Sequence, residues 1–430
     1  MSVLDRKLWR DLTRMKAQVA TIALVVACGV ASWVTMRSAY DSLLASRDAY
    51  YDRYSFGDVF VKVNRAPLAV AARVATVVGV SVFETRIVKE ITLDVPGTAE
   101  PVRVQAVSLA QESLRRLNLT YLRSGRVPDP ERGAEVLVNE AFAKAHHLEP
   151  GSVLPAVING HHSDLRVTGV ALSPEYVYIA EPGSFVPDDK RYGVVWMNER
   201  ALASAFQMEG SFNDVVIRLE RGASEPQVIA TLDRLLEPYG TTGAYGRTKH
   251  PSARWVADEI RQLDGQAKVI PSIFLAVAAV LVNVVLARLL GLQREQIAAL
   301  KALGYSNARI GLHYLEYGLV ITVLGALLGT GLGAWGGSAM MNLYKDYFRF
   351  PVLAFQPEIG TLVTGALISI GAGLLGGLGS VRSAVRVPPA EAMRPAAPPV
   401  YHRTVFERVG VYRLLPNSAR MVLRDIERRP

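Results

Sequence analysis

The chain has 430 residues, of which 50% are hydrophobic and 20% charged, and it carries a formal net charge of +9 and a single cysteine. This composition excludes a wholly disordered chain and a scaffold built on internal disulfides, and the length indicates two or three folding units. Because the averages are close to those of an ordinary soluble protein, the distribution of apolar residues along the chain has to decide the class.

Four long apolar segments divide the chain. Residues 17–36 contain no charge, and a helix of this length crosses a hydrocarbon core of about 30 Å. A cleavable signal peptide is the alternative, but the length of the run and Trp33 near its outer end favour a membrane helix. The same signal predicts three further membrane helices, at residues 269–291, 311–344 and 359–381.

Lys and Arg residues flank these segments asymmetrically. They gather in a predicted amphipathic elbow helix at residues 1–16, between the second and third membrane helices, and in a tail at 382–416. The positive-inside rule places these regions and the N-terminus in the cytoplasm. A nucleic-acid partner is the rival explanation of the net charge, and it is disfavoured because the basic residues flank membrane helices.

The remaining pieces are a short external loop at residues 345–358 and a large external block at 37–268. The block begins with a strand, a helix at 67–77 and a strand at 80–95, and near its end a strand at 214–219 precedes a helix at 226–236. We expect these two ends to share one sheet. A mostly β lobe at about 101–198 and a stalk helix at 252–268 complete the block.

The predicted fold is therefore an α-helical membrane protein with four transmembrane helices and an inserted extracytoplasmic α+β domain of two lobes, one with a βαβ start and one mostly β. Without a cysteine in the external block, that domain has to be stabilised by packed cores rather than by disulfides.

The cytoplasmic loop at residues 292–310 contains a short amphipathic helix. Ile297, Leu300 and Leu303 fall on one face of this helix, and Gly304 stands where a helix C-cap is expected. Periodicity alone leaves open a juxtamembrane helix that lies in the lipid headgroups.

Three motifs resemble one family. Residues 294–306, REQIAALKALGYS, look like the hallmark segment of FtsX-like (MacB-like) ABC transporter permeases, and residues 385–395, VRVPPAEAMRP, resemble the closing motif of that family. The runs LEPGSV at 148–153 and LRVTGV at 165–170 are similar to its periplasmic core domain. Gln293, Gln296 and Ser152 depart from the family pattern, which puts the contacts of these positions in doubt.

The resemblance implies a permease subunit gripped by a cytoplasmic ABC ATPase dimer. The ATPase-coupling residues it implies are Arg294, Glu295, Ile297, Ala298, Leu300, Lys301, Leu303, Gly304 and Tyr305. The chain lacks a G-x-x-x-x-G-K-[ST] loop, so we expect ATP and Mg²⁺ to bind the partner and this chain to hold no cofactor and no catalytic residue. Paired histidines at 146–147 and 161–162 lack the spacing of metal ligands, and no metal site is expected.

The implied function is export or extraction of a lipid, lipoprotein, peptide or hydrophobic compound across or from a bacterial inner membrane. ATP-driven movement of the bundle would be transmitted to the periplasmic domain. The alternative is a signalling subunit that activates an external partner such as a cell-wall hydrolase. Expected partners are the ATPase, a second permease half or subunit, membrane lipid and a periplasmic adaptor, with no nucleic acid.

Two features concern assembly. Small residues recur along the third and fourth membrane helices and predict close helix packing, with a face that slides during a conformational cycle as the alternative. The packing glycines are Gly325, Gly329, Gly333, Gly337, Gly373 and Gly377.

The segment WRDLTR at residues 9–14 is similar to LRDIER at 423–428. We therefore expect residues 417–430 to start a second repeat of a duplicated permease; chance similarity is the alternative.

Overall fold

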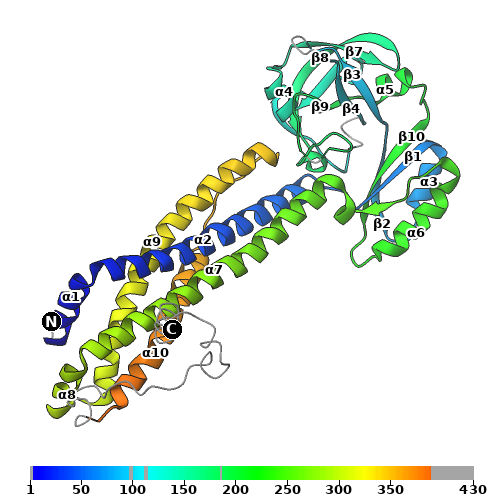
Figure 1. Ribbon diagram of the computed structural model, residues 1–430. Helices are drawn as coiled ribbons and strands as arrows, with labels where there is room; N and C mark the ends of the chain where they lie inside the picture. The colour runs from blue at the N-terminus through cyan, green and yellow to red at the C-terminus, as the bar shows by residue number, and fades with distance from the viewer. Residues whose placement is uncertain (1–2, 96–99, 111–114, 185, 389–430) are drawn as a thin grey trace, which may run out of the picture. The chain divides into compact units, whose positions relative to one another are not determined.

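The computed structural model describes residues 3–95, 100–110, 115–184 and 186–388 (Figure 1). The expected second repeat at 417–430, most of the tail at 382–416 and the closing motif beyond residue 388 lie outside these ranges. The chain forms two compact units, Met1–Val282 with Tyr317–Gly376, and Asn283–Glu316 with Gly377–Pro430.

Within the described ranges, four helices are long and apolar enough to cross a membrane. They are α2 (Lys16–Arg53), α7 (Pro251–Leu292), α9 (Asn307–Tyr347) and α10 (Ile359–Arg386), and the separate α1 (Val3–Arg14) precedes them. All four extend beyond the predicted apolar segments, and α10 continues from the predicted end at residue 381 to Arg386. α2 continues to Arg53, α7 joins the predicted stalk and the second membrane helix in one helix, and α9 starts inside the predicted cytoplasmic loop.

The first of two sheets in the β-rich domain has the strand order β11-β1-β10-β2. Its strands are β1 (Val59–Pro67), β2 (Val80–Arg86), β10 (Ser211–Leu219) and β11 (Tyr245–Gly246). β1 pairs antiparallel with β10, which confirms that the two ends of the block share one sheet. Its apolar face packs against α3 (Ala69–Ala75) and α6 (Glu225–Leu236) through Val70, Val74 and Leu232, among others.

The second sheet has seven strands in the order β5-β8-β6-β9-β4-β3-β7. They are β3 (Val88–Leu93), β4 (Val102–Leu109), β5 (Tyr121–Gly125), β6 (Glu135–Asn139), β7 (Val153–Ile158), β8 (His161–Leu172) and β9 (Tyr192–Asn198). The sheet is mixed, with parallel pairs β4–β9 and β6–β8. Phe142 of α4 (Glu140–Ala145) and Leu202 of α5 (Glu199–Ala205) are part of its core.

The predicted strand at 80–95 is wrong as a single element. β2 pairs with β10 in one sheet, and β3 pairs with β4 and β7 in the other. The break falls at Ile87, whose backbone N–H donates to the Ser108 hydroxyl, while the preceding Arg86 buries its side chain among carboxylates. A buried polar group and a backbone bond to another element therefore divide one β-rich run between two sheets.

The turn LEPGS before β7 illustrates how the sequence sets local structure. Gly151 has a φ of 107°, a region that favours glycine. The Ser152 hydroxyl accepts a hydrogen bond from the Glu149 backbone N–H at 3.1 Å. The Ser152 side chain therefore supplies a hydrogen-bond acceptor that holds this turn.

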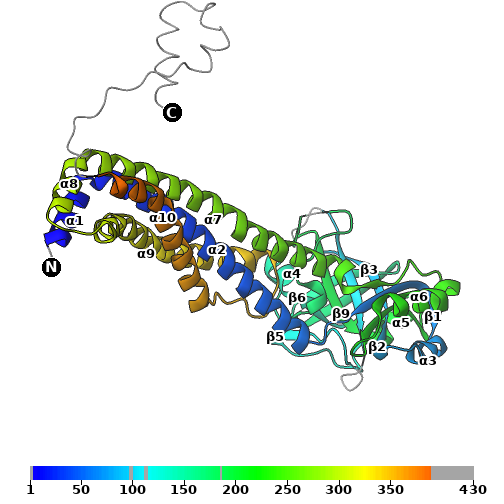
Figure 2. The same cartoon turned by 90° about the horizontal axis from the view of Figure 1, so that it is seen from below.

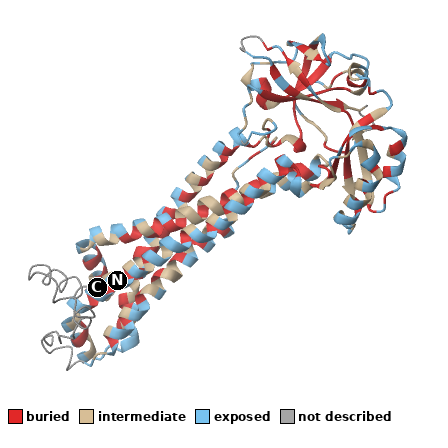
Figure 3. Ribbon diagram, turned by 45° about the vertical axis from the view of Figure 1, so that its right-hand side comes forward, coloured by how far each residue is buried: buried red, intermediate tan, exposed pale blue. Residues whose placement is uncertain are grey.

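Three long helices meet the β-rich domain in one aromatic cluster. Tyr50 and Phe56 come from the end of α2 and beyond it, Val256 from the start of α7, and Phe348 follows α9; all are buried. Buried residues, drawn red in Figure 3, also make up much of the strands of the β-rich domain. Close by, the Arg349 backbone N–H donates to the Val177 carbonyl at 2.7 Å. The segment after α9 is thus packed and hydrogen-bonded to the domain rather than being a free loop.

Candidate functional site: a capped helix between two membrane helices

The short helix predicted from residues 293–310 is α8 (Arg294–Ala302). It ends in a Schellman motif, because the Tyr305 N–H bonds the Leu300 carbonyl at 3.1 Å and the Gly304 N–H bonds the Lys301 carbonyl at 3.0 Å. Gly304 has a φ of 90°, which explains why glycine occupies this position. The C-cap expected from the sequence is therefore present, and it fixes the direction in which the chain leaves α8.

The expected apolar face of α8 is divided. Ile297 is 3% exposed and Ala298 is fully buried, and Leu300 is half-buried. Leu303 is 76% exposed and Tyr305 is 40% exposed. Ile297 and Ala298 therefore hold the helix in place, whereas Leu303, Gly304 and Tyr305 form an exposed end. Among the charged residues, Glu295 is exposed and Arg294 lies, with Ile297, on the lining of a hollow of about 490 Å³.

Lys301 has a role inside the chain. Its ammonium group donates to the backbone carbonyls of Val385 at 2.6 Å and Val387 at 2.7 Å, where α10 ends. A cation at the C-terminus of a helix satisfies carbonyls that lack intrahelical partners and interacts favourably with the helix dipole. The two sequence motifs that carried the family resemblance, at 294–306 and from 385 on, thus contact each other.

Two further side-chain bonds join the helices around α8. The Tyr314 hydroxyl of α9 donates to the Gln293 side-chain carbonyl at 2.9 Å. The Ser380 hydroxyl of α10 is hydrogen-bonded to the side chain of Asn283 in α7. Gln293, a departure from the family pattern, is therefore used as a hydrogen-bond acceptor.

The glycines of α9 lie against α2. Figure 2 shows the ribbons of α2 and α9. A Cβ on Gly325 would stand 2.6 Å from the Val26 Cβ, one on Gly329 would stand 2.6 Å from the Ala27 carbonyl oxygen, and one on Gly333 would stand 2.6 Å from the Val34 Cβ. Such distances do not occur for real side chains, so only glycine permits this approach of the two helices.

The remaining predicted packing glycines lie elsewhere. Gly337 faces the Phe355 ring in the segment before α10, Gly373 of α10 faces Thr322 of α9, and Gly377 is buried.

Trp33, expected to anchor at the membrane surface, donates its indole N–H to the Thr361 carbonyl at 3.1 Å.

A buried charge cluster in the β-rich domain escaped the sequence analysis. The Arg86 guanidinium donates to Glu175 at 2.6 and 2.9 Å and to Asp214 at 2.9 and 2.6 Å. The Asn118 amide donates to Glu175 at 2.7 Å, and His250 lies 3.9 Å from the same carboxylate. The only signal in the sequence is a charged residue, Asp214, at the start of an apolar strand segment.

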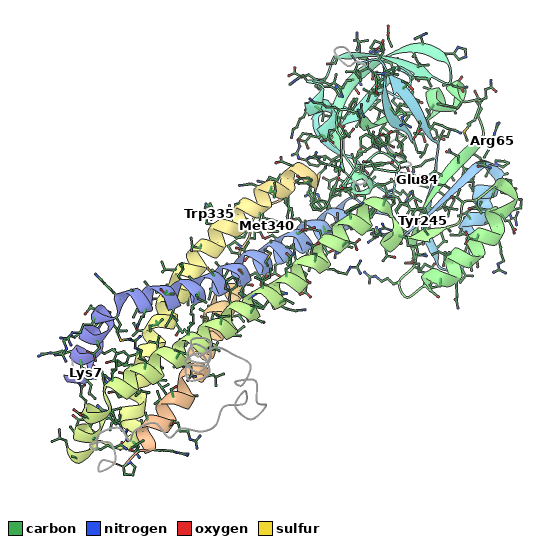
Figure 4. All side chains as sticks on the ribbon, in the orientation of Figure 1. Lys7, Arg65, Glu84, Tyr245, Trp335 and Met340 are labelled. Carbon is green, nitrogen blue, oxygen red and sulfur yellow. The ribbon has the colours of Figure 1, made fainter. Side chains whose placement is uncertain are left out.

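Burial opposes the ionisation of both acids, but with different outcomes. For Glu175, Arg86 and His250 outweigh burial and hold the pKa of the carboxyl well below its ordinary value. For Asp214, burial and the charge of Glu175 outweigh Arg86, and the pKa is raised. Tyr245, labelled in Figure 4, stacks on Phe60 with ring centroids 5.8 Å apart and interacts electrostatically with Asp214, Glu175 and Arg86.

No group of three or more histidine, cysteine, aspartate or glutamate side chains that could hold a metal ion occurs within the ranges that the structure describes.

In the chain, α8 stands between two helices that are long and apolar enough to cross a membrane, and the β-rich domain follows the first such helix. Residues 268–389 match the family model "FtsX-like permease C-terminal". The chain thus carries an FtsX-like permease C-terminal domain, and the resemblance stated from the sequence is confirmed. Together with the four apolar helices, this domain makes it a multi-pass membrane protein.

A curated relative is an uncharacterized ABC transporter permease of Mycoplasma genitalium, which is 25% identical over 202 residues; the match covers 44% of this chain and 15% of the relative. The chain thus matches a small part of that relative's length. Two solved structures resemble the β-rich domain. One is the periplasmic region of MacB from Actinobacillus actinomycetemcomitans, with 9% sequence identity and a TM-score of 0.30; the match covers 48% of this chain and 92% of that one. The other is the extracellular domain of the noncanonic ABC-type transporter YknZ from Gram-positive bacteria, with 12% identity and a TM-score of 0.28; the match covers 44% of this chain and 98% of that one.

Proposed function

We propose that this chain is the transmembrane subunit of an ABC transporter in the bacterial inner membrane, with the N-terminus and α8 in the cytoplasm and the β-rich domain in the periplasm. A separate cytoplasmic ATPase dimer binds ATP and Mg²⁺, and its cycle moves the β-rich domain. The chain performs no chemistry itself. The substrate is a lipid, a lipoprotein, a peptide or a hydrophobic compound that is exported or extracted from the membrane.

The observation that carries this proposal is the exposed end of α8. Leu303 and Tyr305 are apolar or aromatic side chains left uncovered on a helix whose other face is buried and whose end is fixed by the Schellman motif. An exposed apolar group on a fixed element is typical of a surface that a partner covers. The positive-inside distribution of Lys and Arg supports a cytoplasmic position for this surface, on the side where ATP is available.

Transmission in this proposal follows the chain. α8 follows α7 after the single residue Gln293, and α7 is one helix from Pro251 to Leu292. The first turns of α7 contribute Ala253 and Val256 to the aromatic cluster of the β-rich domain. A force on α8 therefore has a continuous helical connection to that domain. A second permease half or subunit and a periplasmic adaptor complete the proposed assembly.

The test is a pair of charge substitutions at the exposed end of α8. Leu303→Asp and Tyr305→Asp each place a charge on the proposed contact surface without changing a buried residue, so the chain should still fold. The rate of ATP hydrolysis by the ATPase in the reconstituted complex should then no longer depend on the presence of this chain. Val186→Asp, at a residue 67% exposed in the β-rich domain, is the matched control. Wild-type coupling in both α8 variants would remove the proposed role of α8.

The same reconstitution separates transport from signalling. Intact ATP coupling with movement of a candidate lipid or hydrophobic compound supports transport. Intact coupling without movement, accompanied by activation of an external hydrolase, would assign the chain to signalling instead.

A further inference from the structure

A cavity of about 820 Å³ runs beside α2 where this helix leaves its apolar segment. Its walls are the outer part of α2, residues 351–358 before α10, and Tyr121 of β5. The volume lies in the range of about 300–1,000 Å³ that is usual for sites of small molecules. None of the residues that line it belongs to α8.

The cavity follows the axis of α2. Asp41 and Arg53 are the first and last residues of α2 on its lining, and their twelve-residue separation corresponds to about 18 Å along the helix. Between them, Ser42, Ala45 and Ala49 line the cavity at helical spacing, so that small side chains leave room on one face. Since the apolar run of α2 ends at Met36, the Asp41 end is the one next to the membrane.

The far end of the cavity is aromatic. The rings of Tyr50 and Tyr54 are 5.1 Å apart, and those of Tyr54 and Tyr121 are 5.9 Å apart, both edge to face. Tyrosines provide apolar faces for a hydrophobic or aromatic group. Arg53 also lines this end, which disfavours a cation there.

The end next to the membrane is acidic. Asp41 and Glu358 both line it, and they interact electrostatically. Asp41 forms an ion pair with Arg37 at 3.2 Å. Within the described ranges Glu358 has no ion-pair partner closer than 4.0 Å. This end therefore has an excess of negative charge, and a positively charged group placed there would relieve the repulsion between the two carboxylates.

We propose that this cavity binds a cationic amphiphile, with the ammonium group at Asp41 and Glu358 and the apolar body along Ala45 and Ala49 towards the tyrosines. The amphiphile enters from the leaflet on the side of the β-rich domain, since the acidic end adjoins the apolar segment of α2. The inference that this amphiphile is a transported substrate rests on the proposed function, whereas its binding to the cavity needs no ATPase.

The experiment uses the purified full chain in lipid nanodiscs, titrated with three probes that share one tail: dodecylamine, dodecan-1-ol and dodecanoate. Empty nanodiscs give the contribution of partition into lipid. We expect saturable binding that is tightest for dodecylamine. Glu358→Gln should weaken dodecylamine binding by about fivefold, the size expected for a partly exposed ion pair, and leave dodecan-1-ol unchanged.

A second variant tests the space rather than the charge. Ala49→Leu fills the cavity and should weaken the binding of all three probes. Ala20→Leu, at an exposed position of α2 outside the cavity lining, should weaken the binding of none of them. Non-saturable binding, tightest binding of dodecanoate, or an unchanged preference for the amine in Glu358→Gln would each overturn the proposal. Because no ATPase is present, these outcomes leave the proposed role of α8 untouched, and a loss of ATP coupling in the α8 variants leaves this binding unaffected.

Discussion

Arg86 and Glu175 face each other as a buried fork, with Nη1 donating to Oε2 at 2.6 Å and Nη2 donating to Oε1 at 2.9 Å. Arg86 is the last residue of β2 in the four-stranded sheet, and Glu175 lies in the 3₁₀ turn Pro174–Tyr176 that follows β8 of the seven-stranded sheet. The same guanidinium binds Asp214 of β10. One arginine therefore ties the two sheets of the β-rich domain together.

Replacing Arg86 by methionine should destabilise the β-rich domain severely. The variant leaves Glu175 and Asp214 buried without their cation, and breaking a buried ion pair from one side costs about 3–5 kcal/mol. We expect the free energy of unfolding of the full chain, measured by chemical denaturation in detergent, to fall by this amount.

The matched control for this variant is Arg103→Met. Arg103 pairs with Glu181 on the surface, and its side chain is 60% exposed, so the loss should stay below about 1 kcal/mol. Adding Asp214→Asn to Arg86→Met removes one of the two buried charges and should restore part of the stability. Equal losses for Arg86→Met and Arg103→Met would contradict the structural role of the fork.

Acid should unfold the β-rich domain partly through Glu135. Hydrogen bonds from Arg126, together with one from the Asp129 backbone N–H, outweigh burial and lower the pKa of the Glu135 carboxyl from 4.5 to about 2. A carboxyl with a lowered pKa in the folded state contributes stability above its unfolded pKa, and this contribution is lost as the pH falls from about 4.5 to about 2.

Glu135→Gln should therefore lower the melting temperature at pH 7 and flatten its decline between pH 4.5 and pH 2, as measured by thermal unfolding at a series of pH values. Glu131→Gln, at an exposed carboxyl nearby, should keep the wild-type profile. A Glu135→Gln profile parallel to that of the wild type would show that this carboxyl is not linked to folding.

Adding a single methyl group to α9 should separate it from α2. In Gly329→Ala the new Cβ would meet the Ala27 carbonyl oxygen at 2.6 Å, and overpacking of this kind costs about 1–3 kcal/mol. Gly331→Ala lies on the same helix with nothing within 4 Å of the new atom. The melting temperature in detergent should fall for Gly329→Ala only, and equal values for the two variants would refute the close contact.

Lys301 should act by positioning α8. Lys301→Met removes both hydrogen bonds to the Val385 and Val387 carbonyls while keeping an unbranched side chain. Hydrogen bonds to a charged group contribute about 1.5–3 kcal/mol, so we expect weaker coupling of ATP hydrolysis in the reconstituted complex together with a lower melting temperature. Lys301→Arg retains the charge and the donors and should restore both, whereas a loss of coupling without loss of stability would indicate direct contact with the ATPase.

The sequence by itself predicted the four long apolar helices, the amphipathic helix between the second and third, and the resemblance that the match to an FtsX-like permease C-terminal domain bears out. These are local properties, because a run such as residues 17–36 needs only its own composition to cross a bilayer, and Gly304 needs only its own lack of a Cβ to cap α8. The pairing of the block's two ends in one sheet was also predicted, because both ends carry apolar strand patterns that need a partner.

Only the tertiary structure decided that Lys301 binds α10 rather than facing outward, that the strand predicted at 80–95 is divided between two sheets, and that Arg86, Glu175 and Asp214 form one cluster. These outcomes depend on residues far apart in the chain, and no local pattern marks them. The physical reason is that a buried charge is stable only beside its partners, and the partner of Arg86 is chosen by the way two sheets pack.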